Sequence, residues 1–221
     1  MQLEAFECRC GDSQFVSMPH KLLDARGTQE PQGVSMMFYP VIQTILEKLP
    51  GGVSLPVEYP AGVGQNTASG EKFVIDTINQ GLCDCPAQKY ALFGYSQGAT
   101  LMLRALSQLR SEAMRAVSSV ILFGNPYRLP GKLSNVNGIG QPGNDATVGL
   151  FVNSAIADDE TIPQLSTKLD QSSKALDYCL EGDGVCAPNF ACSCQLPAEH
   201  LSYGLVASVQ DTAVEHVIAG L

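Results

Sequence analysis

The sequence predicts a single α/β domain, 1–221, in which a mostly parallel sheet is covered by helices on both faces. Two observations lead to this fold class. Strand-like apolar runs alternate along the chain with segments of helical periodicity, which is the pattern of a parallel sheet flanked by helices. No internal repeat or low-complexity linker interrupts the 221 residues, a length suited to one domain with a sizeable core.

Five apolar runs are predicted to be strands, which makes the expected sheet five-stranded. They cover 20–25, 53–59, 89–95, 118–124 and 173–178. Residues 126–147 are dense in Gly, Pro and Asn, so we expect a long surface excursion there. The segment 148–170 has a brief strand-like start and an acidic continuation, and its sequence indicates no definite element.

Four helices are predicted between and after these strands. The first has an apolar face at i, i+3, i+4 spacing and ends at Pro50-Gly51-Gly52; the face comprises Val34, Met37, Phe38, Val41, Ile42, Ile45, Leu46 and Leu49. The others cover 68–82, 97–110 and the stretch from 203 to the end of the chain. The last of them would bury Leu205, Val209, Ala213 and Val217.

The net charge of −9 makes nucleic acid and anionic membranes unfavourable partners. No apolar run approaches the roughly 20 residues that cross a bilayer, so no integral membrane segment is expected. The first ten residues lack a basic start and an apolar stretch, so no signal peptide is visible. Eight cysteines nevertheless indicate an oxidising compartment. We therefore expect a secreted, extracellular protein in a mature form, with an initiator Met in place of its leader.

Six of the cysteines form Cys-X-Cys pairs, namely Cys8/Cys10, Cys83/Cys85 and Cys192/Cys194. Cys179 and Cys186 close a short loop. The spacing alone does not give the connectivity. Zinc is the alternative use of these thiols, but the chain has three histidines and no Cys-X₂-Cys pair, so no metal is expected.

Gly94-Tyr95-Ser96-Gln97-Gly98 places a serine between a predicted strand and a predicted helix. A tight strand-to-helix turn needs small flanking residues, which the two glycines supply. Such a turn lifts the hydroxyl out of the sheet at a helix N-terminus, where developing negative charge is favoured. Ser96 is therefore the candidate nucleophile, and an ordinary surface turn is the alternative interpretation.

A serine hydroxyl needs an adjacent base near pH 7. His20 opens the first strand and His216 lies in the last helix, whereas His200 lies in a loop that enters this helix. Loops beyond the carboxyl ends of parallel strands carry the chemistry of such folds, so His200 is the candidate base. An exposed loop histidine is the alternative.

The acid that orients the base should lie between the serine and the histidine in the chain. Asp183 does so, and a disulfide between Cys179 and Cys186 would make its loop rigid. A rigid carboxylate can hold the imidazole in one tautomer. The other acidic candidates have more ordinary explanations in a strand or in solvent; they are Asp177, Glu181, Asp158 and Asp159.

Acyl transfer also needs donors for an oxyanion. The backbone N–H of Gln97, directly after the serine, is one such donor. The second is expected from the loop after the first strand, where Gly27 permits a sharp bend and Thr28 offers an N–H and a hydroxyl. A plain turn is the alternative for this loop.

With these residues in view, the chain resembles the cutinase family, in particular the small fungal cutinase-like polyester hydrolases. The resemblance covers most of the chain. It rests on four segments in the same order: Ala25-Arg-Gly-Thr-Gln-Glu-Pro-Gln-Gly33, Gly94-Tyr-Ser-Gln-Gly98, Gly182-Asp-Gly-Val-Cys186 and His200-Leu-Ser-Tyr203. It implies a compact α/β-hydrolase fold without a lid.

The resemblance also implies roles for individual residues. Ser96 is the expected nucleophile, His200 the base and Asp183 the orienting acid, with Thr28 and Gln97 as the oxyanion hole. Asn66 matches a family asparagine that positions the oxyanion hydroxyl. No metal or organic cofactor is required by this chemistry.

The same resemblance implies the disulfide Cys179–Cys186, beside the acid. Family members commonly have fewer cysteines than this chain. We expect the extra ones to join Cys8 and Cys10 to Cys83 and Cys85, and Cys192 to Cys194.

The function that follows is a secreted, monomeric serine esterase acting on cutin, similar aliphatic polyesters or short-to-medium acyl esters. Four apolar residues are candidates to hold acyl chains, with packing as the alternative: Val63, Phe190, Leu196 and Leu201. The first alternative function is acetylxylan esterase, against which the absence of Trp is a weak argument. The second is a non-catalytic secreted binding module on the same scaffold.

Overall fold

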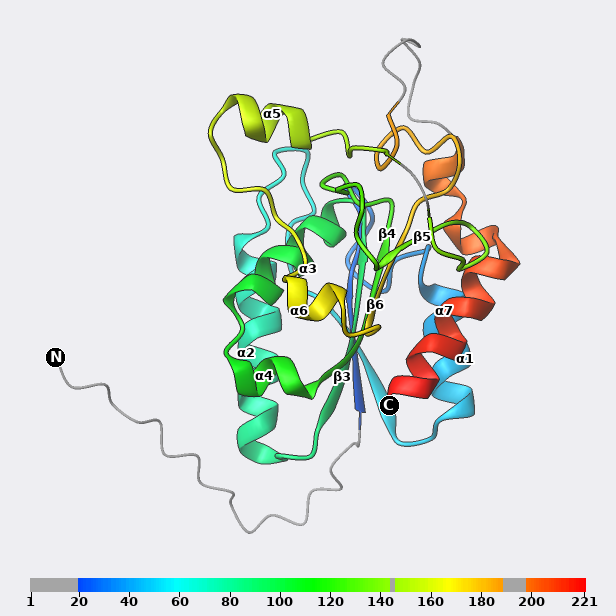
Figure 1. Ribbon diagram of the computed structural model, residues 1–221. Helices are drawn as coiled ribbons and strands as arrows, with labels where there is room; N and C mark the ends of the chain where they lie inside the picture. The colour runs from blue at the N-terminus through cyan, green and yellow to red at the C-terminus, as the bar shows by residue number, and fades with distance from the viewer. Residues whose placement is uncertain (1–19, 144–145, 189–197) are drawn as a thin grey trace, which may run out of the picture.

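The computed structural model describes residues 20–143, 146–188 and 198–221, in which one twisted sheet lies between two layers of helices (Figure 1). The sheet contains β1 (His20–Ala25), β2 (Gly52–Pro56), β3 (Lys89–Tyr95), β4 (Val117–Phe123), β5 (Asn135–Val136) and β6 (Ala175–Tyr178). The strand order is β2-β1-β3-β4-β6-β5, and each neighbouring pair is parallel. The predicted α/β-hydrolase type of fold is thereby confirmed.

The sheet has one strand more than the five predicted. The added strand, β5, lies within 126–147, and its two residues pair with Asp177 and Tyr178 of β6. A two-residue strand has no alternation that a sequence pattern could reveal. Beyond it, Val136 forms an isolated antiparallel bridge with Pro142, so the chain folds back along this edge of the sheet.

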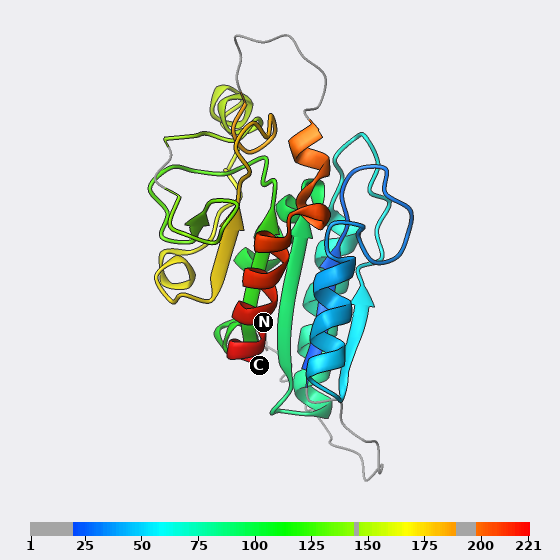
Figure 2. The ribbon, with the colours of Figure 1, turned by 90° about the vertical axis from the view of Figure 1, so that its right-hand side faces the viewer.

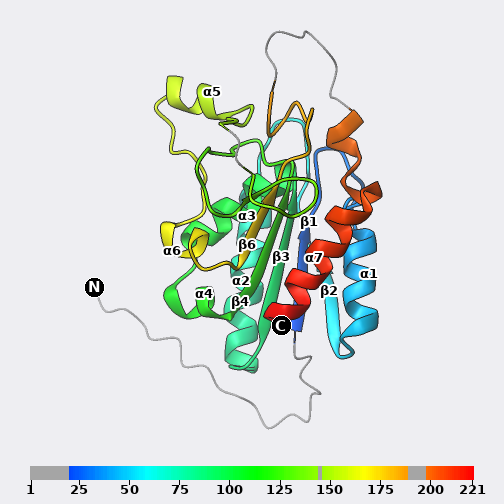
Figure 3. The ribbon, with the colours of Figure 1, turned by 45° about the vertical axis from the view of Figure 1, so that its right-hand side comes forward.

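Four long helices supply most of the two covering layers. They are α1 (Tyr39–Lys48), α2 (Ala68–Asp84), α3 (Gln97–Gln108) and α7 (Ala207–Gly220). Short helices are α4 (Ser111–Ala116), α5 (Val152–Ala157) and α6 (Thr167–Asp170), with 3₁₀ turns η1 (Ala198–Leu201) and η2 (Tyr203–Leu205). In Figure 1, α2, α3 and α4 lie on one side of the sheet and α1 and α7 on the other, and the intermediate view of Figure 3 shows the same separation.

The predicted first and last helices are shorter than expected at their amino ends. The first begins at Tyr39, where Pro40 occupies the first turn and its fixed φ suits a helix start. The last begins at Ala207, because residues 203–205 form the turn η2 instead, and Leu205, which was predicted to be buried, is 87% exposed there. Figure 2 looks onto α1 and α7, which run beside each other across the sheet and are in contact.

Side chains of successive strand residues enter two separate cores, one on each face of the sheet. Leu22 packs in the core under α1 and α7, and Leu23 packs in the core under α2 and α3. The same alternation holds for Phe93 and Leu92 in β3. Both faces are buried, which explains why the central strands are continuous apolar runs rather than alternating ones.

The parallel arrangement brings the predicted site residues to one edge of the sheet. Ser96 directly follows β3, Asp183 follows β6, and the segment with Thr28 follows β1. Since all three strands point the same way, their carboxyl ends meet at the same edge. The fold therefore places a candidate site there.

Candidate active site

Ser96 lies in a sharp turn between β3 and α3, and its backbone has φ 54° and ψ −117°. This positive φ is an unfavourable conformation for a residue with a side chain. The amide of Ser96 donates to the carbonyl of Phe123 in β4 at 2.9 Å, which ties the turn to the neighbouring strand. The side chain is half-buried, so the hydroxyl stands at the surface of the sheet edge.

The two glycines around Ser96 are required by close backbone approaches. A Cβ on Gly98 would lie 1.9 Å from the carbonyl oxygen of Ala25 in β1. A Cβ on Gly94 would lie 2.6 Å from the carbonyl oxygen of Gly98 itself. Only a residue without a side chain fits either position, so the turn depends on both glycines.

Ser96, His200 and Asp183 form a continuous hydrogen-bonded chain. His200 Nε2 lies 3.0 Å from Ser96 Oγ. On the other side of the ring, His200 Nδ1 lies 3.0 Å from both carboxylate oxygens of Asp183. Proton transfer from a hydroxyl to an imidazole needs heavy-atom distances of about 2.6–3.2 Å, and these distances fall in that range. The structure therefore brings together the three residues that the sequence predicted.

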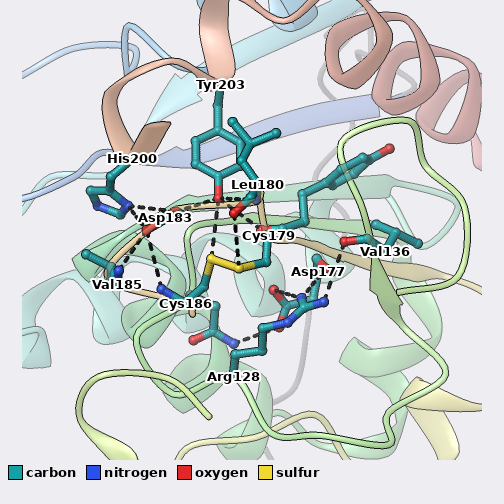
Figure 4. The surroundings of a disulfide bond; sticks show 12 residues. Arg128, Val136, Asp177, Cys179, Leu180, Asp183, Val185, Cys186, His200 and Tyr203 are labelled. Carbon is teal, nitrogen blue, oxygen red and sulfur yellow. Dashed lines mark hydrogen bonds and ion pairs between the residues drawn. A yellow bond between two sulfur atoms is a disulfide. The ribbon is translucent and has the colours of Figure 1, made fainter. Parts of the chain in front are cut away.

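Asp183 is fully buried and receives further hydrogen bonds. Tyr203 donates from its hydroxyl to Oδ2 at 2.6 Å, and the backbone amide of Val185 donates to Oδ1 at 2.7 Å. Figure 4 shows that His200 and Tyr203 both point toward this carboxylate. Burial acts to raise the pKa of Asp183, but the hydrogen bonds and the charge of His200 outweigh it, and the pKa is lowered. Asp183 is therefore held as a carboxylate.

Tyr203 is a residue that the sequence analysis quoted but gave no role. Burial and the negative charge of Asp183 raise its pKa well above the ordinary value, so the hydroxyl stays a proton donor. It also accepts from the amide of Leu180 at 3.2 Å. Its spacing from His200 is the signal that could have indicated this role. Side chains three residues apart in 3₁₀ turns point in the same direction, and Tyr203 follows His200 by three residues.

Gly124 and Tyr95 were also missed, and both hold His200. Gly124 has φ +60°, and a Cβ there would lie 2.6 Å from Cε1 and 2.7 Å from Nδ1 of the imidazole. The hydroxyl of Tyr95 donates to the backbone carbonyl of His200 at 2.8 Å. A glycine directly after an apolar strand was the visible signal for the first contact. Nothing in the sequence indicated the second, which joins residues 105 positions apart.

The alternative histidines lie elsewhere. His20 begins β1 beside Lys89, at the amino ends of strands whose carboxyl ends carry the site. His216 Nε2 lies 3.1 Å from the carbonyl oxygen of Lys174. Asp177, the main rival of Asp183, is buried in β6 and forms an ion pair with Arg128 at 3.1 Å. His216 and Asp177 therefore have structural partners away from Ser96.

The two predicted oxyanion donors are next to each other. The hydroxyl of Thr28 lies 3.4 Å from Oε1 of Gln97, whose Nε2 donates to the carbonyl of Gly62 at 3.1 Å. Gln97 is the first residue of α3, so its N–H is one of the amides that have no partner within the helix. Backbone N–H groups in this position can donate hydrogen bonds to a developing negative charge.

The contact that the resemblance assigned to Asn66 is made by its neighbour. Gln65 Nε2 donates to the Thr28 hydroxyl at 3.1 Å. Asn66 Oδ1 instead accepts from the amide of Ala68 at 3.1 Å, at the start of α2. Gln65 adopts a positive φ of 56° in the turn before α2. In the structure Gln65, rather than Asn66, supports the hydroxyl.

The disulfide Cys179–Cys186 is confirmed, with a Cα–Cα distance of 5.8 Å. It closes the loop that carries Asp183, as Figure 4 shows. Cys8, Cys10, Cys192 and Cys194 lie outside the described residues, so the pairing of the first two with Cys83 and Cys85, and the Cys192–Cys194 bridge, stay predictions. Phe190 and Leu196 also lie outside them.

Within 20–143, 146–188 and 198–221, no cluster of three His, Cys, Asp or Glu side chains is arranged to hold a metal ion. In the same ranges, no helix combines the length and the apolar character that crossing a membrane requires.

Comparisons with known proteins give the family of the chain. A family model described as Cutinase matches residues 17–221. The curated cutinase cut1 of Trichoderma harzianum is 37% identical over 113 residues, which are 48% of this chain and 45% of that protein. The chain thus spans less than half the length of this curated relative.

Two solved structures extend the comparison. A cutinase-like protein from Cryptococcus sp. is 35% identical, with a TM-score of 0.79 over 91% of this chain and 94% of its own. The catalytic core domain of acetyl xylan esterase from Trichoderma reesei has a TM-score of 0.71 over 93% of this chain and 100% of its own. It is 23% identical, so this second likeness shows the fold alone.

Proposed function

Because this chain belongs to the cutinase family, we propose that it is a serine esterase that cleaves carboxylic esters through an acyl-enzyme. The observation that carries the proposal is the set of three 3.0 Å contacts that link Ser96, His200 and Asp183. This is the arrangement by which an unreactive hydroxyl becomes a nucleophile near neutral pH.

In the proposed course, Ser96 Oγ attacks the ester carbonyl while His200 Nε2 takes its proton. The N–H of Gln97 and the N–H and hydroxyl of Thr28 stabilise the oxyanion. The protonated imidazole, held in place by Asp183, then gives the proton to the leaving alkoxide, and an alcohol departs. Water attacks the acyl-enzyme with His200 again as base, which releases the acid and restores Ser96. No metal or cofactor takes part.

We propose aliphatic polyesters such as cutin, and short-to-medium acyl esters, as the substrates. Exposed apolar side chains on segments next to the site support an apolar substrate. Val63 is 72% exposed beside the Gly62–Gln97 contact, and Leu201, next to His200, is 57% exposed. Met36 and Leu205 are 64% and 87% exposed on adjoining segments. A half-buried Ser96 suits a substrate that stays in a solid surface.

We also propose that the enzyme is secreted and acts as a monomer. The disulfide beside the acid supports an oxidising compartment. The negative net charge of −9 supports a protein that stays dispersed in solution.

The first test is labelling with an alkyl phosphonate, followed by peptide mapping. We expect a single adduct, on Ser96, and Ser96→Ala should take up no label and lose activity by a factor of about 10⁴ or more while keeping its melting temperature. A matched control is Ser202→Ala, since Ser202 is a half-buried serine two residues from His200. Absence of any adduct on the parent chain would favour a non-catalytic binding module.

The second test defines the substrate. Initial rates on p-nitrophenyl esters from acetate to long chains, on an aliphatic polyester film and on acetylated xylan would be compared. We expect the highest rates on acyl chains longer than acetate, with release of soluble acids from the film. A preference for acetylated xylan over every longer acyl ester would replace the polyester with the acetylxylan alternative.

A further inference from the structure

The segment that carries Thr28 is held by an unusually dense set of hydrogen bonds. It connects β1 to α1, and several of its bonds end on one side chain, that of Glu30. This carboxylate lies outside the chain of Ser96, His200 and Asp183, and the proposed reaction gives it no task.

Glu30 contacts Gly27, the residue before Thr28, from two directions. Its Oε2 accepts from the amide of Gly27 at 2.5 Å, and its own backbone amide donates to the carbonyl of Gly27 at 3.2 Å. That carbonyl belongs to the same peptide plane as the N–H of Thr28. Fixing the carbonyl therefore fixes the direction in which the Thr28 N–H points.

The other carboxylate oxygen anchors Glu30 at the far end of the segment. Oε1 accepts from the amide of Met36 at 2.9 Å and from the hydroxyl of Ser35 at 3.1 Å. Ser35 is itself held, because its amide donates to the buried Asp24 at 2.6 Å. The carboxylate thus joins both ends of the loop to the carboxyl end of β1.

The residue after Thr28 is fixed as well. Gln29 has a positive φ of 64°, and its amide donates to the carbonyl of Ala61 at 2.8 Å. Arg26 Nε donates to the carbonyl of Glu30 at 2.8 Å, which restrains the main chain behind the carboxylate. The peptide planes on both sides of Thr28 are therefore set before any substrate binds.

We infer that Glu30 is a positioning residue of the proposed esterase: its carboxylate fixes the Arg26–Gly27 peptide and its backbone amide fixes the following Gly27–Thr28 peptide, so that Thr28 faces the oxyanion. The inference rests on the proposed function. Donors that are already oriented cost no reorganisation when the oxyanion forms, so their effect appears in the transition state. Glu30 acts through Thr28 and does not contact the reacting atoms.

Glu30→Gln is the most discriminating substitution, because it keeps the shape and one oxygen acceptor. Two donors converge on Oε1 and one on Oε2. The amide oxygen should therefore stay with Met36 and Ser35, and the amide nitrogen should face the Gly27 N–H. Two donors then oppose each other, so the Arg26–Gly27 peptide loses its acceptor and Gly27 no longer holds Thr28 in one orientation.

The experiment measures kcat and KM on p-nitrophenyl butyrate, with active serines counted by phosphonate titration. For Glu30→Gln we expect kcat per titrated serine to fall by about tenfold, and KM to change by less than about twofold. The loss in kcat should be smaller than the factor of about 10²–10³ that follows removal of a whole oxyanion donor. The matched control is Gln32→Ala, in the same loop, since Gln32 contacts Arg26 and Val57 rather than Gly27. Its kcat should stay within about twofold of the parent.

Glu30→Asp is the second variant, to be used if Glu30→Gln does not fold. It keeps the charge, but the shorter side chain cannot reach both Gly27 and Met36. We therefore expect kcat to fall again while KM stays unchanged. Three outcomes would overturn the inference and leave the esterase proposal standing. They are an unchanged kcat, a rise in KM as large as the loss of kcat, and a loss of kcat in Gln32→Ala equal to that in the Glu30 variants. A parent chain without ester hydrolysis would overturn both.

Discussion

Removing the Tyr203 hydroxyl tests whether the charge of Asp183 is stabilised as the structure indicates. In Tyr203→Phe the ring keeps its packing, including the stacked contact with Phe123 at a centroid distance of 5.0 Å. The variant loses the hydrogen bond to Asp183 Oδ2 at 2.6 Å and the one from the amide of Leu180 at 3.2 Å. Both groups are buried, so water does not replace the hydroxyl.

The expected cost follows from these two bonds. A hydrogen bond to a charged group contributes about 1.5–3 kcal/mol, and an amide left buried without an acceptor adds about 1 kcal/mol or more. We expect the free energy of unfolding to fall by about 3 kcal/mol, which corresponds to about 6–12 °C in melting temperature for a domain of this size.

Tyr178→Phe is the matched control, because Tyr178 is also a buried tyrosine and its hydroxyl bonds to the neutral Thr212 at 2.8 Å. Its loss should be about 1 kcal/mol, the usual value for a neutral hydrogen bond. Guanidinium unfolding at neutral and at acid pH would measure both variants.

The pH dependence gives a second discriminating result. The pKa of Asp183 is lowered in the folded state, so its stabilisation is present above the pKa of the unfolded chain and is lost as the pH falls through the folded value. The loss of unfolding free energy caused by Tyr203→Phe should therefore decrease in acid, toward the loss caused by Tyr178→Phe. The reasoning would be refuted if both variants lost the same free energy of unfolding at neutral pH. It would also be refuted if the loss in Tyr203→Phe did not change with pH.

Three further predictions follow from the contacts described. Gly124→Ala should lower kcat by about 100-fold, because the added Cβ displaces the His200 ring. Gly131 has a similar positive φ but open space around it, so Gly131→Ala should lower the stability and leave kcat unchanged. Equal kcat values in the two variants would contradict this prediction. Replacing Cys179 and Cys186 together by serine should lower the free energy of unfolding by about 2.5 kcal/mol through the opened loop, and an unchanged guanidinium midpoint would be the contrary result. Burial raises the pKa of Asp24 from 3.8 to about 8, so its charge increasingly destabilises the fold as the pH rises between these values. The side chain of Asp24 lies among Arg26, Glu30 and Tyr59. Over this pH range Asp24→Asn should gain stability relative to the parent, whereas a substitution of the exposed Asp76 by Asn should not.

The elements that the sequence predicted well are those with a long local pattern. The runs 20–25 and 89–95 have the bounds of β1 and β3, because central strands buried on both faces are continuous apolar segments. The order of Ser96, Asp183 and His200 in the chain, with the turn glycines, was enough to select three residues that the fold brings together.

The residues that were missed act across the sheet edge rather than along the chain. Tyr95 reaches a carbonyl 105 positions away, and Gly124 matters because of a ring that belongs to η1. Asn66 and Gln65 are adjacent polar residues, and only the backbone turn decides which of them faces Thr28. Such choices depend on tertiary geometry, which periodicity and spacing do not contain.

The outer strands of the sheet bear on how molecules would behave when crowded together on a solid polymer. An unprotected strand offers a row of amides and carbonyls to a neighbouring copy and can start fibril-like association. Here one border has only the two residues of β5, shielded by the bridge from Val136 to Pro142. The opposite border, β2, is five residues long and finishes at Pro56, whose ring nitrogen carries no hydrogen to share. Both borders of the sheet are therefore short, and each carries a feature that limits pairing with a neighbouring copy.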